Sequence, residues 1–128
     1  MIVDASALLA ILLREPERPR FRELIALAAE PVISPVNFLE VAVRADALGD
    51  AEGRGLDRLI QISGISIVQV TAEQAELARD AYHRFGKGNH PARLNLGDCF
   101  AYALAKAGNE PLLFKSEDFR LTDVEAAL

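Results

Sequence analysis

Short apolar runs alternate with longer helical segments along the whole chain, and this alternation most restricts the fold. The runs 2–3, 31–34, 65–70 and 111–114 are rich in Ile, Val and Leu, as is typical of short buried strands. The run 65–70 is the clearest strand because most of its residues are β-branched. Strands that alternate with helices form mainly parallel sheets with right-handed crossovers. The sequence therefore predicts an α/β fold with a short, mainly parallel central sheet.

Capping and breaking residues predict where the helices begin and end. Ser34 followed by Pro35 is typical of an N-cap and a first helical position. Thr71 and Asn95 are expected to cap two further helices, and Gly64 is expected to end one. The predicted helices cover about 6–13, 20–29, 35–48, 51–62, 72–85 and 96–107.

The length of 128 residues suits one domain spanning 1–128. The chain has 14 basic and 19 acidic side chains and a net charge of −5. This balance argues against a broad basic surface for nucleic acid. It is compatible with a local acidic metal site, since a bound divalent cation reverses the local field.

Cys99 is the single cysteine, which excludes an intramolecular disulfide and a cysteine-based zinc site. The opening residues lack the cationic segment of a signal peptide. No apolar run approaches the roughly 20 residues of a membrane span. We therefore expect a cytoplasmic protein with no membrane association.

Three acidic residues stand where a carboxylate is unusual, although each also has a structural explanation. Asp4 follows the first strand and could cap the next helix, as could Ser6. Glu40 is the lone charge in an apolar helical stretch and could pair with Arg44 at i+4. Asp98 would be the third residue after the cap Asn95, where its negative charge interacts favourably with the helix dipole.

Glu117 and Asp118 follow the last strand, where an ordinary polar turn would also explain them. Together with the three earlier acids, they lie either at strand ends of one predicted parallel sheet or in the apolar helices of the same fold. Clustered carboxylates repel each other, so some must bind a proton or share a cation. Oxygen-only ligands favour Mg²⁺ or Mn²⁺. Such a site can orient a phosphodiester and activate a water.

The sequence around these acids resembles the PIN-domain family, most closely the VapC-type toxins of bacterial toxin–antitoxin systems. The similarity follows the order of the family's motifs over nearly the whole chain. The matching segments are Ile2-Val3-Asp4-Ala5-Ser6, Ser34-Pro35-Val36-Asn37-Phe38-Leu39-Glu40, Leu96-Gly97-Asp98-Cys99 and Pro111-Leu112-Leu113-Phe114-Lys115-Ser116-Glu117-Asp118-Phe119.

This resemblance implies a three-layer α/β/α sandwich and an endoribonuclease that depends on Mg²⁺ or Mn²⁺. It implies a homodimer that is inhibited by a VapB-type antitoxin. By position, Asp4, Glu40 and Asp98 would bind the metal, and Ser6 would be a polar helper.

The fourth acid departs from the family pattern. Many members carry an acid two residues before the Asp-Phe pair, where this chain has Ser116. Glu117 or Asp118 must then take its place, or the site has three acids. We expect Glu117 to face the site as a catalytic acid and Asp118 to be a more structural helper.

Other functions fit less well. A haloacid dehalogenase-type phosphatase needs a second Asp two residues after the first, where Ser6 stands. A receiver domain needs adjacent acids after its first strand. A non-catalytic PIN-like binding module is the remaining alternative, although Asp4, Glu40 and Asp98 are all present. Two scattered residues, His83 and His90, are too few for a histidine metal site.

Overall fold

A computed structural model describes all residues 1–128 and contains one four-stranded sheet flanked by helices. The strands are β1 (Ile2–Val3), β2 (Val32–Ile33), β3 (Ser66–Ile67) and β4 (Leu112–Leu113). Every strand pair is parallel, and the order across the sheet is β3-β2-β1-β4. The prediction of a short, mainly parallel sheet is therefore confirmed.

Six α-helices and one short 3₁₀ helix complete the fold. They are α1 (Ala5–Leu12), α2 (Arg18–Leu27), α3 (Pro35–Leu48), α4 (Asp50–Ser63), α5 (Ala72–Phe85), α6 (Leu96–Gly108) and the 3₁₀ helix η1 (Glu117–Leu121). The predicted caps are confirmed, because the side chains of Ser34, Thr71 and Asn95 each accept a backbone N–H of the helix that follows. Gly64 ends α4 with a φ of 66°, a conformation that glycine adopts without strain.

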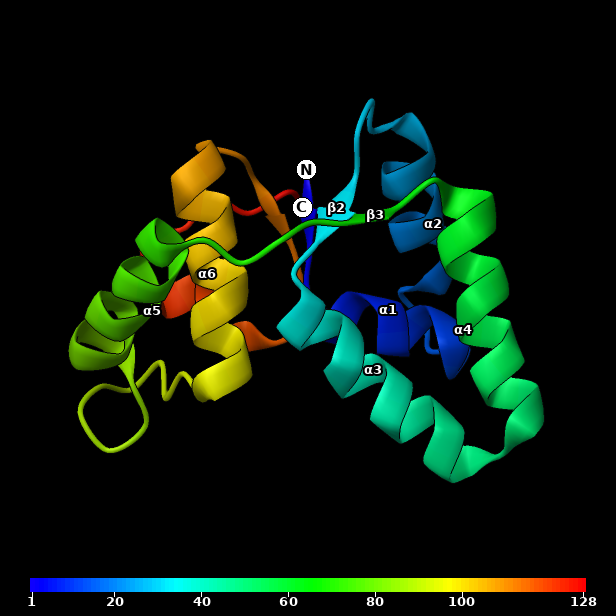
Figure 1. Cartoon of the computed structure of the whole chain (residues 1–128), viewed down its shortest axis with the longest axis horizontal. Helices are drawn as coiled ribbons and strands as arrows, with labels where there is room; N and C mark the ends of the chain where they lie inside the picture. Colours follow the sequence, from blue (N-terminus) through cyan, green and yellow to red (C-terminus); the bar gives the residue numbers. More distant parts are fainter.

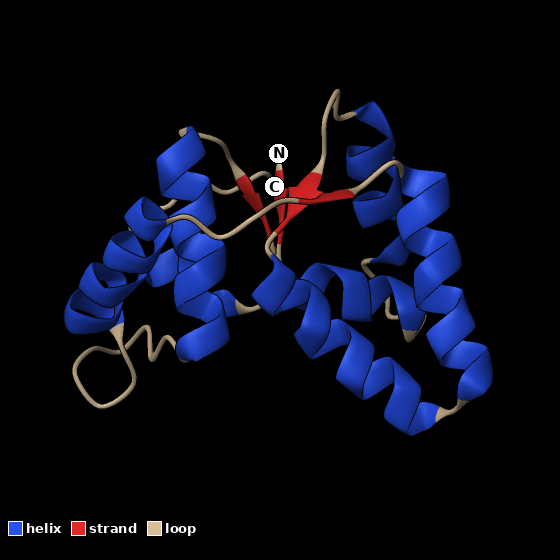
Figure 2. Cartoon of the chain, in the orientation of Figure 1, coloured by secondary structure: helices blue, strands red, loops and turns tan.

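The helices cover the two faces of the sheet in two layers (Figures 1 and 2). Val3, Ile33 and Leu113 point into a core shared with α1 to α4. Ile2 and Leu112 point the other way, into a core shared with α5 and α6. The alternation of side chains along each two-residue strand thus divides the interior into two cores. This arrangement confirms the predicted α/β/α sandwich.

Two elements differ from their predicted extents by more than one residue at an end. Only Ser66 and Ile67 of the run 65–70 pair with a neighbouring strand, and both are exposed because β3 lies at the edge of the sheet. The β-branched composition therefore predicted the strand but not its length. Helix α2 begins at Arg18 rather than Arg20 because Pro19 is accommodated in its first turn.

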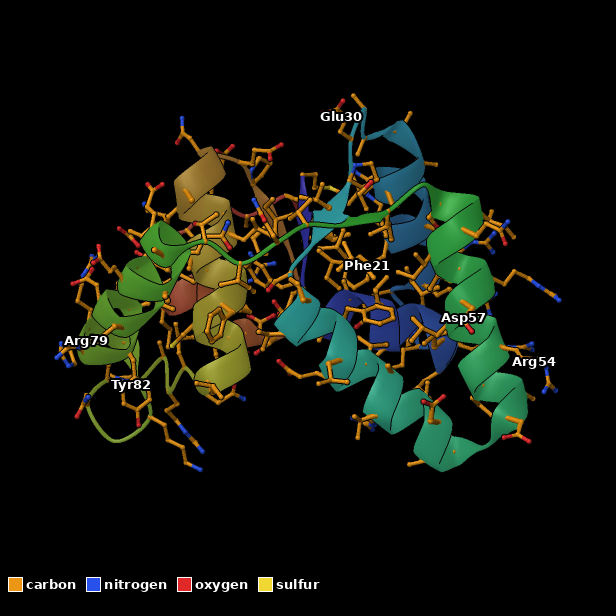
Figure 3. All side chains as sticks on the ribbon, viewed as in Figure 1. Phe21, Glu30, Arg54, Asp57, Arg79 and Tyr82 are labelled. Carbon is orange, nitrogen blue, oxygen red and sulfur yellow. The ribbon has the colours of Figure 1, made fainter.

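The distribution of side chains separates the interior from the surface. Phe21 lies inside the layer formed by α1 to α4, whereas Arg54 and Arg79 point away from the molecule (Figure 3). Phe21 is only 2% exposed. No helix combines the length and hydropathy that crossing a bilayer requires.

Candidate active site

The site lies at the carboxyl end of the central strand β1, where the strand order reverses. The chain proceeds outward from β1 to β2 and β3, then returns to place β4 on the other side of β1. Loops at such a switch diverge and leave a crevice beyond the strand ends. Asp4 follows β1 directly, and η1 follows β4. The backbone therefore brings the first and last acidic segments together.

Asp4 is buried, with 3% of its surface exposed. It is the N-cap of α1, and its Oδ2 accepts from the Ser6 backbone N–H at 3.0 Å and the Ser6 hydroxyl at 2.6 Å. Burial raises the pKa of Asp4, while the hydrogen bonds from Ser6 oppose that change. Of the two candidates for the cap of the first helix, Asp4 is therefore the cap, and Ser6 orients the Asp4 carboxylate.

Glu40 reaches the site from α3. The residue is exposed overall, yet its carboxylate lies against Gly97 in the first turn of α6. Burial of the carboxylate, with the charges of Asp4 and Asp98, raises its pKa to about 7. The alternative of an ion pair between Glu40 and Arg44 is not observed, since none of the ion pairs includes Glu40.

Asp98 lies in the first turn of α6 and completes a capping box. Its Oδ2 accepts from the Asn95 backbone N–H at 3.0 Å, and Asn95 Oδ1 accepts from the Asp98 N–H at 2.9 Å. Burial raises the pKa of Asp98 to about 6, and the charges of Asp4 and Asp118 add to this effect. Asp98 therefore has a capping role and also lies close enough to other acids for their charges to raise its pKa.

The structure places Asp118, rather than Glu117, beside the other acids. The Glu117 side chain is 81% exposed and pairs with Arg120 Nε at 3.2 Å. Asp118 is less exposed, has no cationic partner, and contributes to the raised pKa of Asp98. The expectation that Glu117 faces the site is therefore not supported by these positions. The reason is local. Glu117 and Asp118 are adjacent in η1, so their side chains point in different directions and only one of them can face the site.

The four acids lack cationic partners, because none of the ion pairs involves Asp4, Glu40, Asp98 or Asp118. Their donor set is oxygen only, which fits Mg²⁺ or Mn²⁺. No three of the chain's His, Cys, Asp and Glu side chains are grouped closely enough to hold an ion as they stand. Binding a cation would therefore require at least one carboxylate to rotate inward.

Two residues at this site were not identified as functional from the sequence. Asn37 is 1% exposed, and its Nδ2 donates to the Gly97 carbonyl at 2.9 Å and to Glu40 Oε1 at 3.3 Å. Its position within the apolar helix, three residues before Glu40, was an available signal. The sequence gives no comparable signal for Gly97, because its contact with Glu40 depends on how α3 packs against α6.

The remaining candidates have structural roles. His90 Nδ1 accepts from the Ala92 backbone N–H at 3.0 Å, and its ring packs edge-on against Phe85. Cys99 is buried, and burial raises the pKa of its thiol to about 11. Neither residue supplies a metal ligand or a nucleophile here.

Comparisons with known proteins agree with this architecture. A PIN domain model matches residues 1–125. The chain is similar to a ribonuclease VapC of Mycolicibacterium smegmatis, with 49% identity covering 98% of each chain. It is also similar to ribonuclease VapC30 of Mycobacterium tuberculosis, with 44% identity covering 97% of this chain and 95% of the relative.

A solved structure supports the fold independently. The crystal structure of Mycobacterium tuberculosis VapC20, described as a sarcin-ricin loop cleaving toxin, has a TM-score of 0.75 and 18% identity. The match covers 96% of this chain and 95% of that one. At this identity the likeness shows the fold alone, while the sequence matches show the family. The chain therefore belongs to the PIN-domain family, among the VapC ribonucleases.

Proposed function

We propose that this protein is a divalent-metal-dependent endoribonuclease, the toxin of a VapBC-type pair. The observation that carries the proposal is the set of acids without cationic partners at the sheet's switch point. Burial and mutual repulsion raise the pKa values of Glu40 and Asp98. Membership of the PIN-domain family removes the phosphatase and receiver alternatives.

Asp4, Glu40 and Asp98 would hold the ion, with Asp118 as the fourth acid. A bound Mg²⁺ or Mn²⁺ would neutralise the acids, polarise the phosphodiester and lower the pKa of a water molecule. Ser6 fixes the Asp4 carboxylate through two hydrogen bonds, and Asn95 fixes that of Asp98. Two of the acids are therefore held by the protein before substrate arrives, as efficient catalysis requires.

An acidic protein segment is the partner that best fits a groove lined by helices α1 to α4. This groove has a volume of about 590 Å³, and Leu12, Leu48 and Leu59 are among the residues that line it. Arg18 and Arg22 also line it and form no ion pairs. An amphipathic segment of a VapB-type antitoxin has the matching chemistry.

A homodimer and a cytoplasmic site of action complete the proposal. Leu39 and Val43 on α3 are 60% and 61% exposed, and apolar side chains grouped on one helix are typical of subunit interfaces. Light scattering after size exclusion would test the dimer. A cytoplasmic location follows from the proposed RNA substrate and antitoxin.

The nuclease proposal is tested with purified, antitoxin-free protein and total RNA. Cleavage is expected with Mg²⁺ or Mn²⁺, and none is expected with EDTA. Asp4→Asn should abolish cleavage without changing the circular dichroism spectrum. Cleavage by this variant at the wild-type rate would refute the proposed site. A folded wild type that binds Mn²⁺ but cuts no RNA would instead favour the non-catalytic module.

A further inference from the structure

A buried side-chain amide connects the two helices that carry Glu40 and Asp98. Asn37 Nδ2 donates to the carbonyl oxygen of Gly97 at 2.9 Å and to Glu40 Oε1 at 3.3 Å. Both partners are acceptors, so the amide nitrogen must face them. Asn37 therefore uses its donor group to join the backbone of α6 to a carboxylate of α3.

Gly97 leaves the space that the Glu40 carboxylate occupies. A Cβ built on Gly97 would overlap Glu40 Oε1 and lie 2.8 Å from Oε2. Gly97 is in a regular helical turn and is buried, so its lack of a side chain is not required by the backbone. The atom it would displace belongs to a flexible side chain, so a methyl group here would move Glu40 rather than the fold.

We propose that Asn37 and Gly97 are positioning residues that hold the Glu40 carboxylate beside the first turn of α6. Gly97 provides the space, and Asn37 provides the hydrogen bond that keeps the carboxylate there. This arrangement places Glu40 next to Asp98, the residue after Gly97. The inference deepens the proposed function and rests on it, since it assigns the two residues to the metal-binding acid Glu40.

Asn37 has a further feature that favours a role in the site. Its Oδ1 is buried and accepts no hydrogen bond from the protein, which is costly for a purely structural amide. A residue that only tied α3 to α6 would gain nothing from this free acceptor.

Gly97→Ala is the central test because the substitution removes no polar group from the protein. Alanine is favoured over glycine in a helix, so the variant should fold and melt at or slightly above the wild-type temperature. We expect its Mn²⁺ affinity, measured by electron paramagnetic resonance, and its RNA cleavage rate to fall by about tenfold or more. Wild-type affinity and rate in a folded Gly97→Ala protein would overturn the proposal.

Gly108→Ala is the matched control on the same helix. A Cβ at Gly108 would meet a Glu carboxylate as well, with Glu110 Oε2 at 3.3 Å, but that residue is not part of the site. We expect Mn²⁺ affinity and cleavage to be unchanged. If both alanine variants lose affinity equally, the effect belongs to α6 as a whole and the proposal is wrong.

A double-mutant cycle separates positioning from general packing. In a Glu40→Ala background the carboxylate is absent, so adding Gly97→Ala or Asn37→Ala should not reduce Mn²⁺ affinity further. Full additivity of the losses would show that these residues act independently of Glu40 and would overturn the inference. Asn37→Ala alone should lower both affinity and melting temperature, since it leaves the Gly97 carbonyl unpaired.

These measurements distinguish the inference from the proposed function. If the wild type binds Mn²⁺ but cuts no RNA, the nuclease proposal fails, while the Mn²⁺ affinities of the variants still decide the inference. If the wild type cuts RNA and Gly97→Ala cuts equally well, the positioning role alone fails.

Discussion

The hydroxyl of Ser6 donates to Asp4 Oδ2 at 2.6 Å. The hydroxyl oxygen of Ser6 also accepts a hydrogen bond from the backbone N–H of Lys115 at 2.9 Å. Ser6 thus connects the acid after β1 to the loop after β4. The two sides of the switch point are joined through one side-chain atom.

Ser6→Ala should therefore weaken both the fold and the site. Asp4 would lose its shortest hydrogen bond, and the Lys115 N–H would lose its acceptor. We expect a loss of about 1–2 kcal/mol in the free energy of unfolding measured with urea, together with slower RNA cleavage. Ser66→Ala, in the exposed edge strand β3, is the control and should change neither quantity.

Asp98→Asn should stabilise the metal-free protein at pH 8 while abolishing cleavage. The pKa of Asp98 is raised from 3.8 to about 6 by burial and by Asp4 and Asp118, so its ionised form is disfavoured in the folded state. A neutral amide removes this cost and can still accept from the Asn95 N–H. Thermal melts in EDTA should show a higher melting temperature than wild type. A lower one would contradict the assigned repulsion.

The stability of the metal-free protein should fall as pH rises from 4 to 8. The folded-state pKa is raised from 4.5 to about 7 for Glu40 and from 3.8 to about 6 for Asp98. Groups with raised values stabilise the fold fully below their unfolded pKa, and this contribution is lost as pH passes through the folded value. Melting curves in EDTA across this range would measure the decline.

Addition of Mg²⁺ should reverse this loss at pH 8. A ligand that binds only the folded state stabilises it by about 2.7 kcal/mol at one hundred times its dissociation constant. The gain in melting temperature should be larger at pH 8 than at pH 5, because protonated carboxyls bind cations poorly. An equal gain at both pH values would indicate binding outside the acidic site.

Substitutions at the two adjacent acids of η1 should have unequal effects. Asp118→Asn is expected to slow cleavage and to lower the pKa of Asp98, because it removes a nearby negative charge. Glu117→Gln should leave cleavage unchanged, since that side chain is exposed and pairs with Arg120. Cleavage rates of the two variants under identical Mg²⁺ conditions would decide between them. A larger loss of cleavage in Glu117→Gln than in Asp118→Asn would instead identify Glu117 as the fourth acid.

Local sequence signals predicted most of the fold. Ser34, Thr71 and Asn95 cap the helices as expected because a cap depends on residues within a few positions. The length of β3 could not be predicted, since pairing at a sheet edge depends on the neighbouring strand.

The acids of the site were predicted less evenly. Asp4, Glu40 and Asp98 stood out because each occupies a strand end or an apolar helix. Whether Glu117 or Asp118 faces the site depends on the orientation of one short turn. Two adjacent acidic residues give no sequence signal for that orientation. The contact between Gly97 and Glu40 joins residues from helices on different layers, so it appears only after the layers are packed.

The division of the interior into two cores has a consequence for how activity can be lost. Glu40 is carried by the helices on one face of the sheet and Asp98 by those on the other, with Asp4 between them. A small shear between the layers would separate the carboxylates even if no acid were changed. Deep packing residues such as Leu8 and Tyr102, both fully buried, therefore help to determine catalytic competence as well as thermal resistance.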